Sequence, residues 1–357
     1  MKAIEDVLRK LVEANKTPSV QYRFFNKDTI LHSFYYGEAD VRQHRMTDSR
    51  TTYHAYSVTK TFTAIAILQL AQQGKLDIQQ SAKLYLPDFP YTPDITIKQL
   101  LNHTAGIPNP IPLSWIHLDA DHGNFDAKQF FNSVFAKHNK VKTKPNEKFA
   151  YSNLGFVLLG QVIEYISGMR YEDYIREHII KPIANPASEM DFKVPDIGRH
   201  ATGYHKKNSF SNLILGFFLD KSKFMDSAEG IWKPFKLNYV NGAAYGGLVG
   251  TPDAFVRYIQ ALLQPQSNII SQENKQLLFT ENHTNNGKPT GMCLSWYTGL
   301  LNGNRYYTHA GGGGGYYCEL RIYPEKGVGS VIMFNRTGMT DERYLDNVDT
   351  LILGLGD

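Results

Sequence analysis

Ser57 and Lys60 are the residues best suited to covalent catalysis, and they form the only S-x-x-K sequence in the chain. At the start of a helix, residues three positions apart share one face, so the lysine amine can reach the serine hydroxyl. A serine hydroxyl becomes an effective nucleophile only when a base takes its proton. Lysine titrates near ~10.4 and can be that base only where burial or a neighbouring cation lowers its pKa. Alone, the pattern also fits a helix-capping serine followed by a solvated lysine.

Two further motifs follow in the chain. Tyr151-Ser152-Asn153 directly precedes an apolar segment with helical spacing, and His309-Ala310-Gly311 stands at the end of a segment expected to be a strand. Three motifs in one order, each next to the expected kind of element, are far more specific than any one of them. Together they favour a catalytic explanation over helix capping.

The ordered set resembles the motifs of the penicillin-recognising serine hydrolases, that is, the serine β-lactamase-like and penicillin-binding protein family. Residues 100–107 (LLNHTAGI) look like the family's LLxHTSG segment, and residues 246–253 (GGLVGTPD) look like its GGLxST-x-D segment. Residues 324–335 resemble its late strand pair that ends in an asparagine. The tyrosine motif indicates the branch of class C β-lactamases, D-alanyl-D-alanine carboxypeptidases and esterases.

This resemblance implies roles for individual residues. Ser57 would be the nucleophile, and Lys60 and Tyr151 would share the general base and acid work, in an order that the sequence leaves open. Free tyrosine titrates near ~10, so a tyrosinate at neutral pH needs a nearby cation, for which Lys60 is the candidate. Asn153 would hydrogen-bond Lys60 and the substrate amide. The backbone N–H groups of Ser57 and Gly312 would form the oxyanion hole, where one donor is typically worth ~2.7–4 kcal/mol.

The third motif departs from the β-lactamases, which usually carry lysine where this chain has His309. Histidine titrates near ~6.5 and is largely uncharged at neutral pH unless a carboxylate lies beside it. We therefore expect weaker, pH-dependent recognition of a substrate carboxylate, as in D-peptidases and esterases. The glycines that follow, at residues 311–315, read as backbone that approaches the substrate closely, and Gly311 and Gly312 are expected at the substrate site.

The expected activity is hydrolysis of an ester or amide through an acyl-enzyme, without metal or cofactor: D-alanyl-D-alanine carboxypeptidase-like or esterase-like, with weak β-lactamase activity at most. The fold can also serve as a penicillin-binding sensor or as a scaffold without turnover, although the intact Ser57, Lys60 and Tyr151 argue against a scaffold. A less favoured alternative is a zinc-dependent hydrolase. His117-Leu118-Asp119-Ala120-Asp121-His122 is similar to the zinc motif H-x-H-x-D-H, with Asp119 in place of a histidine.

Two other segments carry weaker signals. Tyr239-Val240-Asn241 is a second Y-x-N sequence that precedes no apolar helix, so we interpret it as a coincidence or a pocket wall. Residues 210–218 (FSNLILGFF), with Phe224 and Trp232, form an aromatic region. Core packing is its default explanation, and a wall of an apolar acyl-group pocket is the functional alternative.

The elements that must position these motifs follow from the hydrophobic periodicity. We expect a hairpin at residues 19–25 and 29–36, a buried helix at 57–73, helices at 95–102, 126–137, 153–167 and 171–180, strands at 294–300, 305–309, 316–323 and 329–334, and a helix at 343–355. Strands near both ends and helices between them indicate an α+β fold. The resemblance specifies it as an antiparallel sheet flanked by N- and C-terminal helices. A single catalytic domain is expected, with an α/β part at residues 1–74 and about 206–357 and an inserted all-helical subdomain at about 75–205.

Composition excludes several other classes of protein. The 357 residues carry a net charge of only +4 and no basic run interleaved with aromatic residues, which argues against nucleic-acid binding. Two cysteines are too few for a disulfide framework. The sequence contains no apolar run of about 18 residues, so it predicts no membrane-spanning helix. Without a recognisable signal peptide we expect a cytoplasmic protein, or a periplasmic or extracellular one if a leader has been removed. Oligomeric state and the identity of the small-molecule or peptide substrate stay open.

Overall fold

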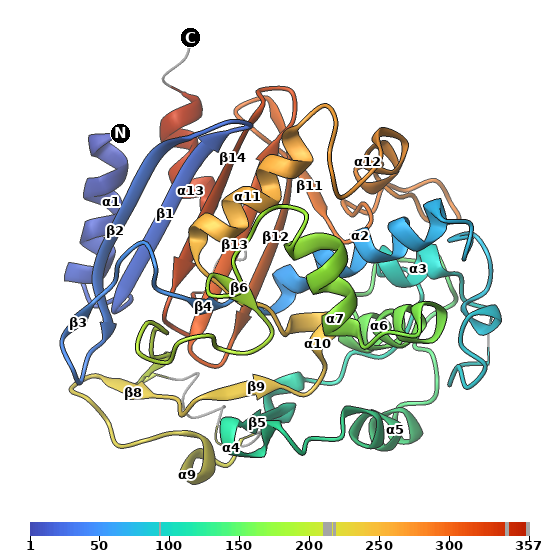
Figure 1. The fold of residues 1–357 in the computed structure, drawn as a ribbon, viewed down its shortest axis with the longest axis horizontal. Helices are drawn as coiled ribbons and strands as arrows, with labels where there is room; N and C mark the ends of the chain where they lie inside the picture. The colour runs from blue at the N-terminus through green and yellow to red at the C-terminus, as the bar shows by residue number, and fades with distance from the viewer. Residues whose placement is uncertain (93, 210–215, 217–218, 340–342, 355–357) are drawn as a thin grey trace.

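The computed structural model describes residues 1–92, 94–209, 216, 219–339 and 343–354. Its centre is an antiparallel sheet with the strand order β11-β12-β13-β14-β1-β2-β3 (Figure 1). The strands are β1 (Ser19–Asn26), β2 (Ile30–Asp40), β3 (Arg45–Met46), β11 (Tyr297–Leu301), β12 (Asn304–Gly313), β13 (Tyr316–Tyr323) and β14 (Val328–Phe334). Because β1 pairs with β14, the two ends of the chain close one sheet.

Helices cover both faces of this sheet. On one face α1 (Lys2–Glu13) and α13 (Leu345–Leu353) bury an apolar stripe that includes Ile4, Leu8 and Val348. Against the other face packs α11 (Pro252–Leu263) (Figure 1). The almost wholly buried α2 (Thr59–Gln72) contacts α11 through Phe62, whose ring stacks on that of Tyr258. The α+β architecture with terminal helices flanking an antiparallel sheet is thus confirmed.

The middle of the chain is mainly helical and lies beside the sheet (Figure 1). Its helices are α3 (Ile97–Leu101), α4 (Asp119–His122), α5 (Ala127–Lys137), α6 (Asn153–Ser167) and α7 (Tyr171–Ile175), the last continued by a π-helical turn (Arg176–Ile180). Short strands also occur there and pair with strands from later in the chain: β5 (Ile116–Leu118) with β9 (Asn238–Val240), β6 (Met190–Asp191) with β10 (Val249–Gly250), and β7 (Tyr204–Lys206) with β8 (Trp232–Pro234). The boundary expected near residue 206 falls inside β7.

Shorter elements complete the fold. They are β4 (Tyr53–His54), α9 (Lys221–Phe224), α10 (Ala243–Gly246), α12 (Gln272–Leu278) and 3₁₀ turns at Tyr56–Val58, Ala82–Leu84 and Pro112–Ser114. Two predicted bounds differ where they matter for the site. Ser57 lies in a 3₁₀ turn just before α2 rather than in its first α-turn, and β12 continues past His309 to Gly313 because its glycines pair with β13.

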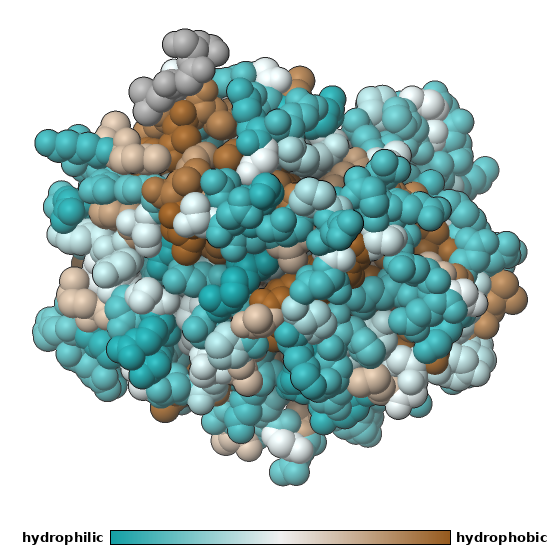
Figure 2. All heavy atoms as spheres, turned by 45° about the horizontal axis from the view of Figure 1, so that its top comes forward, coloured by the Kyte–Doolittle hydropathy of each residue, from teal (hydrophilic) through white to brown (hydrophobic). Residues whose placement is uncertain are grey.

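The surface agrees with the ordinary composition of the chain. The face in Figure 2 is covered mainly by hydrophilic residues, with apolar residues showing in small areas between them. Across the described ranges, no helix has both the length and the apolar character that crossing a membrane requires.

Candidate active site

The turn that carries Ser57 is held in a strained conformation. Tyr56 has φ +44°, a left-handed backbone that costs a residue with a side chain about 1–2 kcal/mol. Its hydroxyl donates a hydrogen bond of 2.9 Å to the Gly314 carbonyl, and its ring lies against Gly313. These contacts with the end of β12 stabilise the turn and place Ser57 in the wall of a cavity.

Lys60 lies one helical turn beyond Ser57 and is completely buried. Its Nζ donates hydrogen bonds to Ser57 Oγ at 3.0 Å and to the Tyr245 carbonyl oxygen at 2.7 Å. The rings of Tyr151, Phe156 and Tyr245 surround the amine at 5.1–5.5 Å. Burial lowers the pKa of Lys60 well below its usual value. The amine therefore has the property that the sequence argument required of a general base.

Tyr151 completes the group around the serine, because its hydroxyl donates a hydrogen bond of 2.9 Å to Ser57 Oγ. His103 positions this tyrosine. Its carbonyl accepts from Ala150 N–H at 2.7 Å, its Nδ1 accepts from Ser152 N–H at 3.1 Å, and its ring lies 4.3 Å from that of Tyr151. Burial lowers the pKa of His103 well below its usual value, so the ring is neutral. The segment at residues 100–107 thus acts as a support for the tyrosine.

Asn153, the first residue of α6, differs from its expected arrangement. Its backbone N–H and its Nδ2 both donate to Asn109 Oδ1, at 3.0 and 3.2 Å. The predicted bond to Lys60 is not formed, because the hydrogen bonds of Lys60 go to Ser57 and Tyr245. Within the described chain, the buried Oδ1 of Asn153 has no hydrogen-bond partner. It lies at the cavity, where it can accept a hydrogen bond from a substrate N–H.

His309 is buried inside β12, with its ring stacked on that of Tyr297 at 5.7 Å. Burial, and to a smaller extent the charge of Lys60, lower the pKa of His309 to about 3, against a small opposing effect of the Ser57 backbone. Without a carboxylate beside it, the ring is therefore neutral at neutral pH. A carboxylate bound beside the ring would favour its protonated form, so pH-dependent recognition of a carboxylate by His309 stays a prediction.

The structure gives a different explanation from the expected one for glycine in β12. A Cβ on Gly311 would lie 2.0 Å from the Ala55 carbonyl oxygen and 2.8 Å from Ser57 N, so the strand needs glycine in order to approach the nucleophile turn. Gly311 does not line the cavity, whereas Gly312 does. A Cβ on Gly312 would meet nothing closer than the Tyr317 ring at 3.9 Å. Close approach to a substrate is therefore wrong as the reason for Gly311.

These groups open into a cavity of about 570 Å³. Its other walls are mostly aromatic and aliphatic and include Pro112, Leu113, Ile116, Phe149, Leu219, Phe235, Val240, Tyr245, Tyr297, Tyr317 and Met339. Among the lining residues that the structure describes, Arg343 is the only permanent cation and no carboxylate occurs. The cavity therefore suits an apolar, uncharged acyl group near Ser57.

The secondary signals in the sequence have simple structural explanations. Val240 lines the cavity, so the second Y-x-N sequence serves as a pocket wall. Phe224 packs in a small apolar cluster with two cavity residues, Leu219 and Phe235, and Trp232 is buried. The aromatic run at residues 210–218 falls, apart from residue 216, outside the described residues.

The zinc-like motif does not form a ligand set. His117 contacts His122 and Asn241 through its two ring nitrogens, each at 2.9 Å, and Asp121 lies 3.9 Å from Lys223 Nζ. Over the residues that can be described, no group of three His, Cys, Asp or Glu side chains is arranged to hold a metal ion. The motif is a polar packing cluster beside the cavity wall.

Sequence reasoning missed two parts of the site and gave no role to a third. Asn109 stands between two prolines in Pro108-Asn109-Pro110, a rigid loop just after the HTAG motif, and that placement is the signal that could have found it. The Tyr245 carbonyl is a backbone atom and has no sequence signal. His103 belongs to a motif that the resemblance identified but did not explain.

Comparison with known proteins agrees with this geometry. A family model described as "Beta-lactamase" matches residues 4–354, so the chain belongs to the beta-lactamase family. Penicillin-binding protein 4* of Bacillus subtilis (strain 168) is 29% identical over 301 residues, which cover 82% of this chain and 63% of the relative. The chain thus spans less than two thirds of the length of that protein.

Solved structures share the fold. The octameric penicillin-binding protein homologue from Pyrococcus abyssi superimposes with a TM-score of 0.79 at 21% identity, covering 100% of this chain and 77% of its own. The D-amino acid amidase from Ochrobactrum anthropi SV3, complexed with D-phenylalanine, gives a TM-score of 0.76 at 20% identity, covering 99% and 98%. At these identities the likeness establishes the architecture only.

Proposed function

We propose that this protein is a serine hydrolase that forms an acyl-enzyme on Ser57 and hydrolyses an ester or amide bond. One observation carries the proposal. Ser57 Oγ lies 3.0 Å from a buried lysine amine and 2.9 Å from a tyrosine hydroxyl, at the wall of a cavity large enough for a small substrate. A nucleophile within hydrogen-bond distance of two proton-transfer groups is the arrangement that covalent catalysis requires.

Acylation follows from these distances. Ser57 Oγ attacks the substrate carbonyl carbon while its proton passes to the neutral amine of Lys60. The carbonyl oxygen becomes an oxyanion, which the backbone N–H groups of Ser57 and Gly312 stabilise. The bond to the leaving group then breaks as Tyr151 donates a proton to the departing oxygen or nitrogen, and the proton on Lys60 restores the tyrosine. Lys60 is the first base in this scheme because burial favours its unprotonated form.

Deacylation uses the same groups with water. A water molecule gives a proton to the Lys60–Tyr151 pair and attacks the acyl carbon, and Ser57 recovers its proton when the ester bond to its Oγ breaks. The acid leaves as product. Each proton returns to its starting position, so one catalytic cycle consumes one water and one ester or amide bond.

The substrate that fits best has an apolar acyl group and an ester or amide of the D-peptide or short-chain class. The neutral His309 supplies no cation for a carboxylate next to the scissile bond, so we expect slow turnover of β-lactams. The unpaired Asn153 Oδ1 can accept a hydrogen bond from an amide N–H of the acyl part. The similarity to a penicillin-binding protein and to a D-amino acid amidase supports this class.

The test is intact-protein mass spectrometry after incubation with a fluorescent penicillin and, separately, with p-nitrophenyl butyrate. We expect an adduct or ester turnover in the natural chain and neither in Ser57→Ala. Activity that survives this substitution would place the site elsewhere. A stable adduct with no turnover of either reagent would instead support a sensor, and no reaction of the folded natural chain would support a scaffold.

A further inference from the structure

Three of the residues that line the cavity come from three separate segments of the chain. Thr308 comes from β12, Tyr317 is the second residue of the buried strand β13, and Arg343 lies two residues before α13. Hydrogen bonding within the sheet fixes the two strands. The segment that carries Arg343 lies outside the sheet, so other contacts hold it against them.

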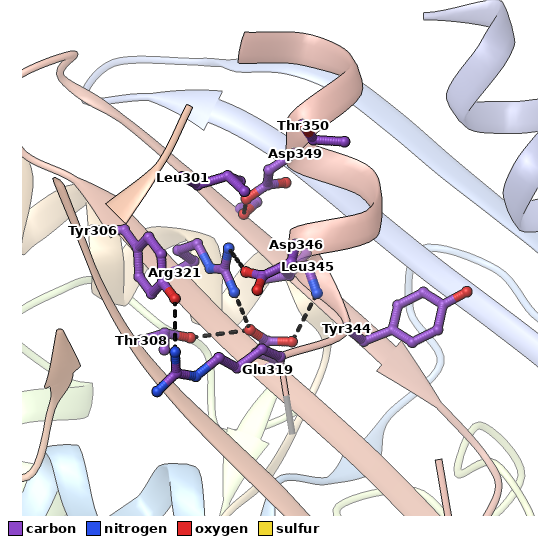
Figure 3. Close-up of polar contacts among 12 residues, drawn as sticks. Leu301, Tyr306, Thr308, Glu319, Arg321, Tyr344, Leu345, Asp346, Asp349 and Thr350 are labelled. Atoms are coloured by element: carbon purple, nitrogen blue, oxygen red, sulfur yellow. Dashed lines mark hydrogen bonds and ion pairs between the residues drawn. The ribbon is translucent and has the colours of Figure 1, made fainter. Parts of the chain in front are cut away.

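All three segments contact one buried carboxylate, that of Glu319 on β13. Its Oε1 accepts from Arg321 Nη2 at 2.8 Å and lies 3.1 Å from Thr308 Oγ1, whose proton is shared with the Leu320 carbonyl oxygen at 2.8 Å. Its Oε2 accepts from the Tyr317 hydroxyl at 3.0 Å and from Leu345 N–H at 2.9 Å. Figure 3 shows Thr308, Arg321 and Leu345 converging on this carboxylate. Two of the four donors belong to cavity-lining residues, and a third is the first N–H of α13.

This bond to Leu345 fixes the turn from which Arg343 reaches the cavity. Tyr344 N–H donates to the Tyr317 hydroxyl at 3.4 Å, and Arg343 Nη1 donates to the Tyr306 hydroxyl at 3.2 Å. A negative charge at the first turn of α13 also interacts favourably with the helix dipole. The carboxylate thus joins the start of α13 to the strands beneath it.

An acid at this position is costly. Glu319 and Arg321 are both completely buried, and burial raises the pKa of Glu319 to about 7 although Arg321 opposes the rise. Arg321 is shared with Asp346 of α13, 2.5 Å from its Nη1. Packing a helix on a sheet does not require such a network, because apolar residues of similar volume often serve as well or better. Its contacts with the cavity wall give a reason for keeping it.

We propose that Glu319 is a positioning residue for substrate binding: its carboxylate holds Thr308, Tyr317 and the Arg343 segment in the arrangement that forms one wall of the substrate cavity. This role rests on the proposed acyl-transfer function. It concerns binding rather than proton transfer, because the hydrogen bonds described for Glu319 go to Thr308, Tyr317, Arg321 and Leu345. We therefore expect its loss to weaken substrate binding and to leave the chemical step almost unchanged.

A matched pair of variants separates this role from simple stability. Glu319→Gln keeps the size of the side chain but replaces one acceptor oxygen with an NH2 group. This group is itself a donor and cannot accept from the donors that face it. Asp349→Asn makes the same change at a second buried carboxylate on the same side of the sheet, which accepts from Tyr22, Tyr323 and Ser330. None of these three lines the cavity. Both variants should unfold more easily than the natural chain.

The experiment is steady-state hydrolysis of p-nitrophenyl butyrate at pH 8, with hydrogen exchange of the peptide covering residues 343–349. We expect Glu319→Gln to raise KM about tenfold, to change kcat less than about threefold and to accelerate exchange of this peptide. Glu319→Asp, which keeps the charge, should recover part of the KM. Asp349→Asn should change KM less than about twofold.

Several outcomes would overturn the proposal. Unchanged exchange at residues 343–349 in Glu319→Gln would show that the carboxylate does not hold the segment. Faster exchange with an unchanged KM, or an equal rise of KM in Asp349→Asn, would reduce the role of Glu319 to stability. A natural chain that hydrolyses nothing and forms no adduct contradicts the proposed function itself, and this is recognised before any Glu319 variant is compared.

Discussion

Lys60 donates a hydrogen bond of 2.7 Å to the backbone carbonyl of Tyr245. The preceding carbonyl of α10, that of Ala244, accepts from Thr63 Oγ1 at 2.7 Å, so the helix is tied to α2 at two adjacent positions. A carbonyl is a neutral acceptor. It orients the amine toward Ser57 without favouring the charged form as strongly as a carboxylate would. Burial thus lowers the pKa of Lys60, whereas the hydrogen bond to the Tyr245 carbonyl orients its amine.

The first prediction concerns the pH dependence of the reaction. The unprotonated amine is the active form, so kcat/KM for p-nitrophenyl butyrate should rise as pH increases through the pKa of Lys60. Because burial lowers this pKa, the inflection should lie well below the ~10.4 of a free lysine. A pH–rate profile of the natural chain measures it. A rise centred near the free-lysine value would contradict the role of Lys60 as the first base.

A second prediction addresses the tyrosine. Tyr151→Phe removes the hydroxyl that bonds to Ser57 Oγ but keeps the ring that packs on His103. The fold should persist, and turnover should fall by about 10²–10⁴-fold, the usual contribution of a general acid or base. Stopped-flow or steady-state hydrolysis, with thermal unfolding as the control for folding, measures the loss. A variant within a few-fold of the natural rate would leave Tyr151 without a catalytic role.

A third prediction follows from the Asn109–Asn153 pair. Asn109→Ala leaves two donors of Asn153 without their acceptor, which frees the side chain to rotate. An unsatisfied buried donor costs about 1–3 kcal/mol, so we expect KM for an amide substrate to rise about tenfold. Asn109→Asp retains the acceptor and is the matched control, expected to stay near the natural value. Equal KM values in both variants would show that Asn109 does not orient Asn153.

Much of the site could be predicted from the sequence, because its chemistry resides in side chains with restrictive motifs. Ser57, Lys60 and Tyr151 do meet, as the three ordered motifs implied, and Asn153 and His309 lie at the same cavity. The hairpins and most helices were predicted within a few residues, since their hydrophobic periods are regular.

The remaining features depend on long-range contacts that leave little trace in the sequence. The glycine run seemed to end the strand after His309, yet pairing with β13 extends β12 to Gly313, so tertiary pairing outweighs the low strand propensity of glycine. The partner of Asn153 comes from a loop that has no periodicity. The titration of His309 is set by burial rather than by residue type.

A fourth prediction contrasts two adjacent glycines. Gly311→Ala would place a methyl group 2.0 Å from the Ala55 carbonyl oxygen, which must displace either β12 or the nucleophile turn. We expect a loss of at least about 1–3 kcal/mol of stability together with most activity. Gly312→Ala should fold normally, since its methyl group meets nothing within 3.9 Å. Chemical unfolding of the two variants decides the matter, and equal stabilities would contradict the close approach of Gly311.

The last prediction is that acid destabilises the protein through its buried histidines. Burial lowers the pKa values of His54 and His309 to about 3, so between about pH 6.5 and 3 the unfolded chain binds more protons than the folded one. Each such histidine then lowers the free energy of unfolding by about 1.4 kcal/mol per pH unit of acidification. Glu319, with its pKa raised to about 7, acts in the opposite direction between about pH 4.5 and 7, and burial also raises the pKa values of Glu164 and Asp349. The buried His103, His200 and His205, whose pKa values are lowered, add to the effect of the two histidines. Urea unfolding from pH 6.5 to 4.5 should show this decline, and His54→Gln should reduce its slope by about 1.4 kcal/mol per unit, because glutamine has no proton to gain. A slope that His54→Gln leaves unchanged would mean that His54 does not remain neutral in the folded protein.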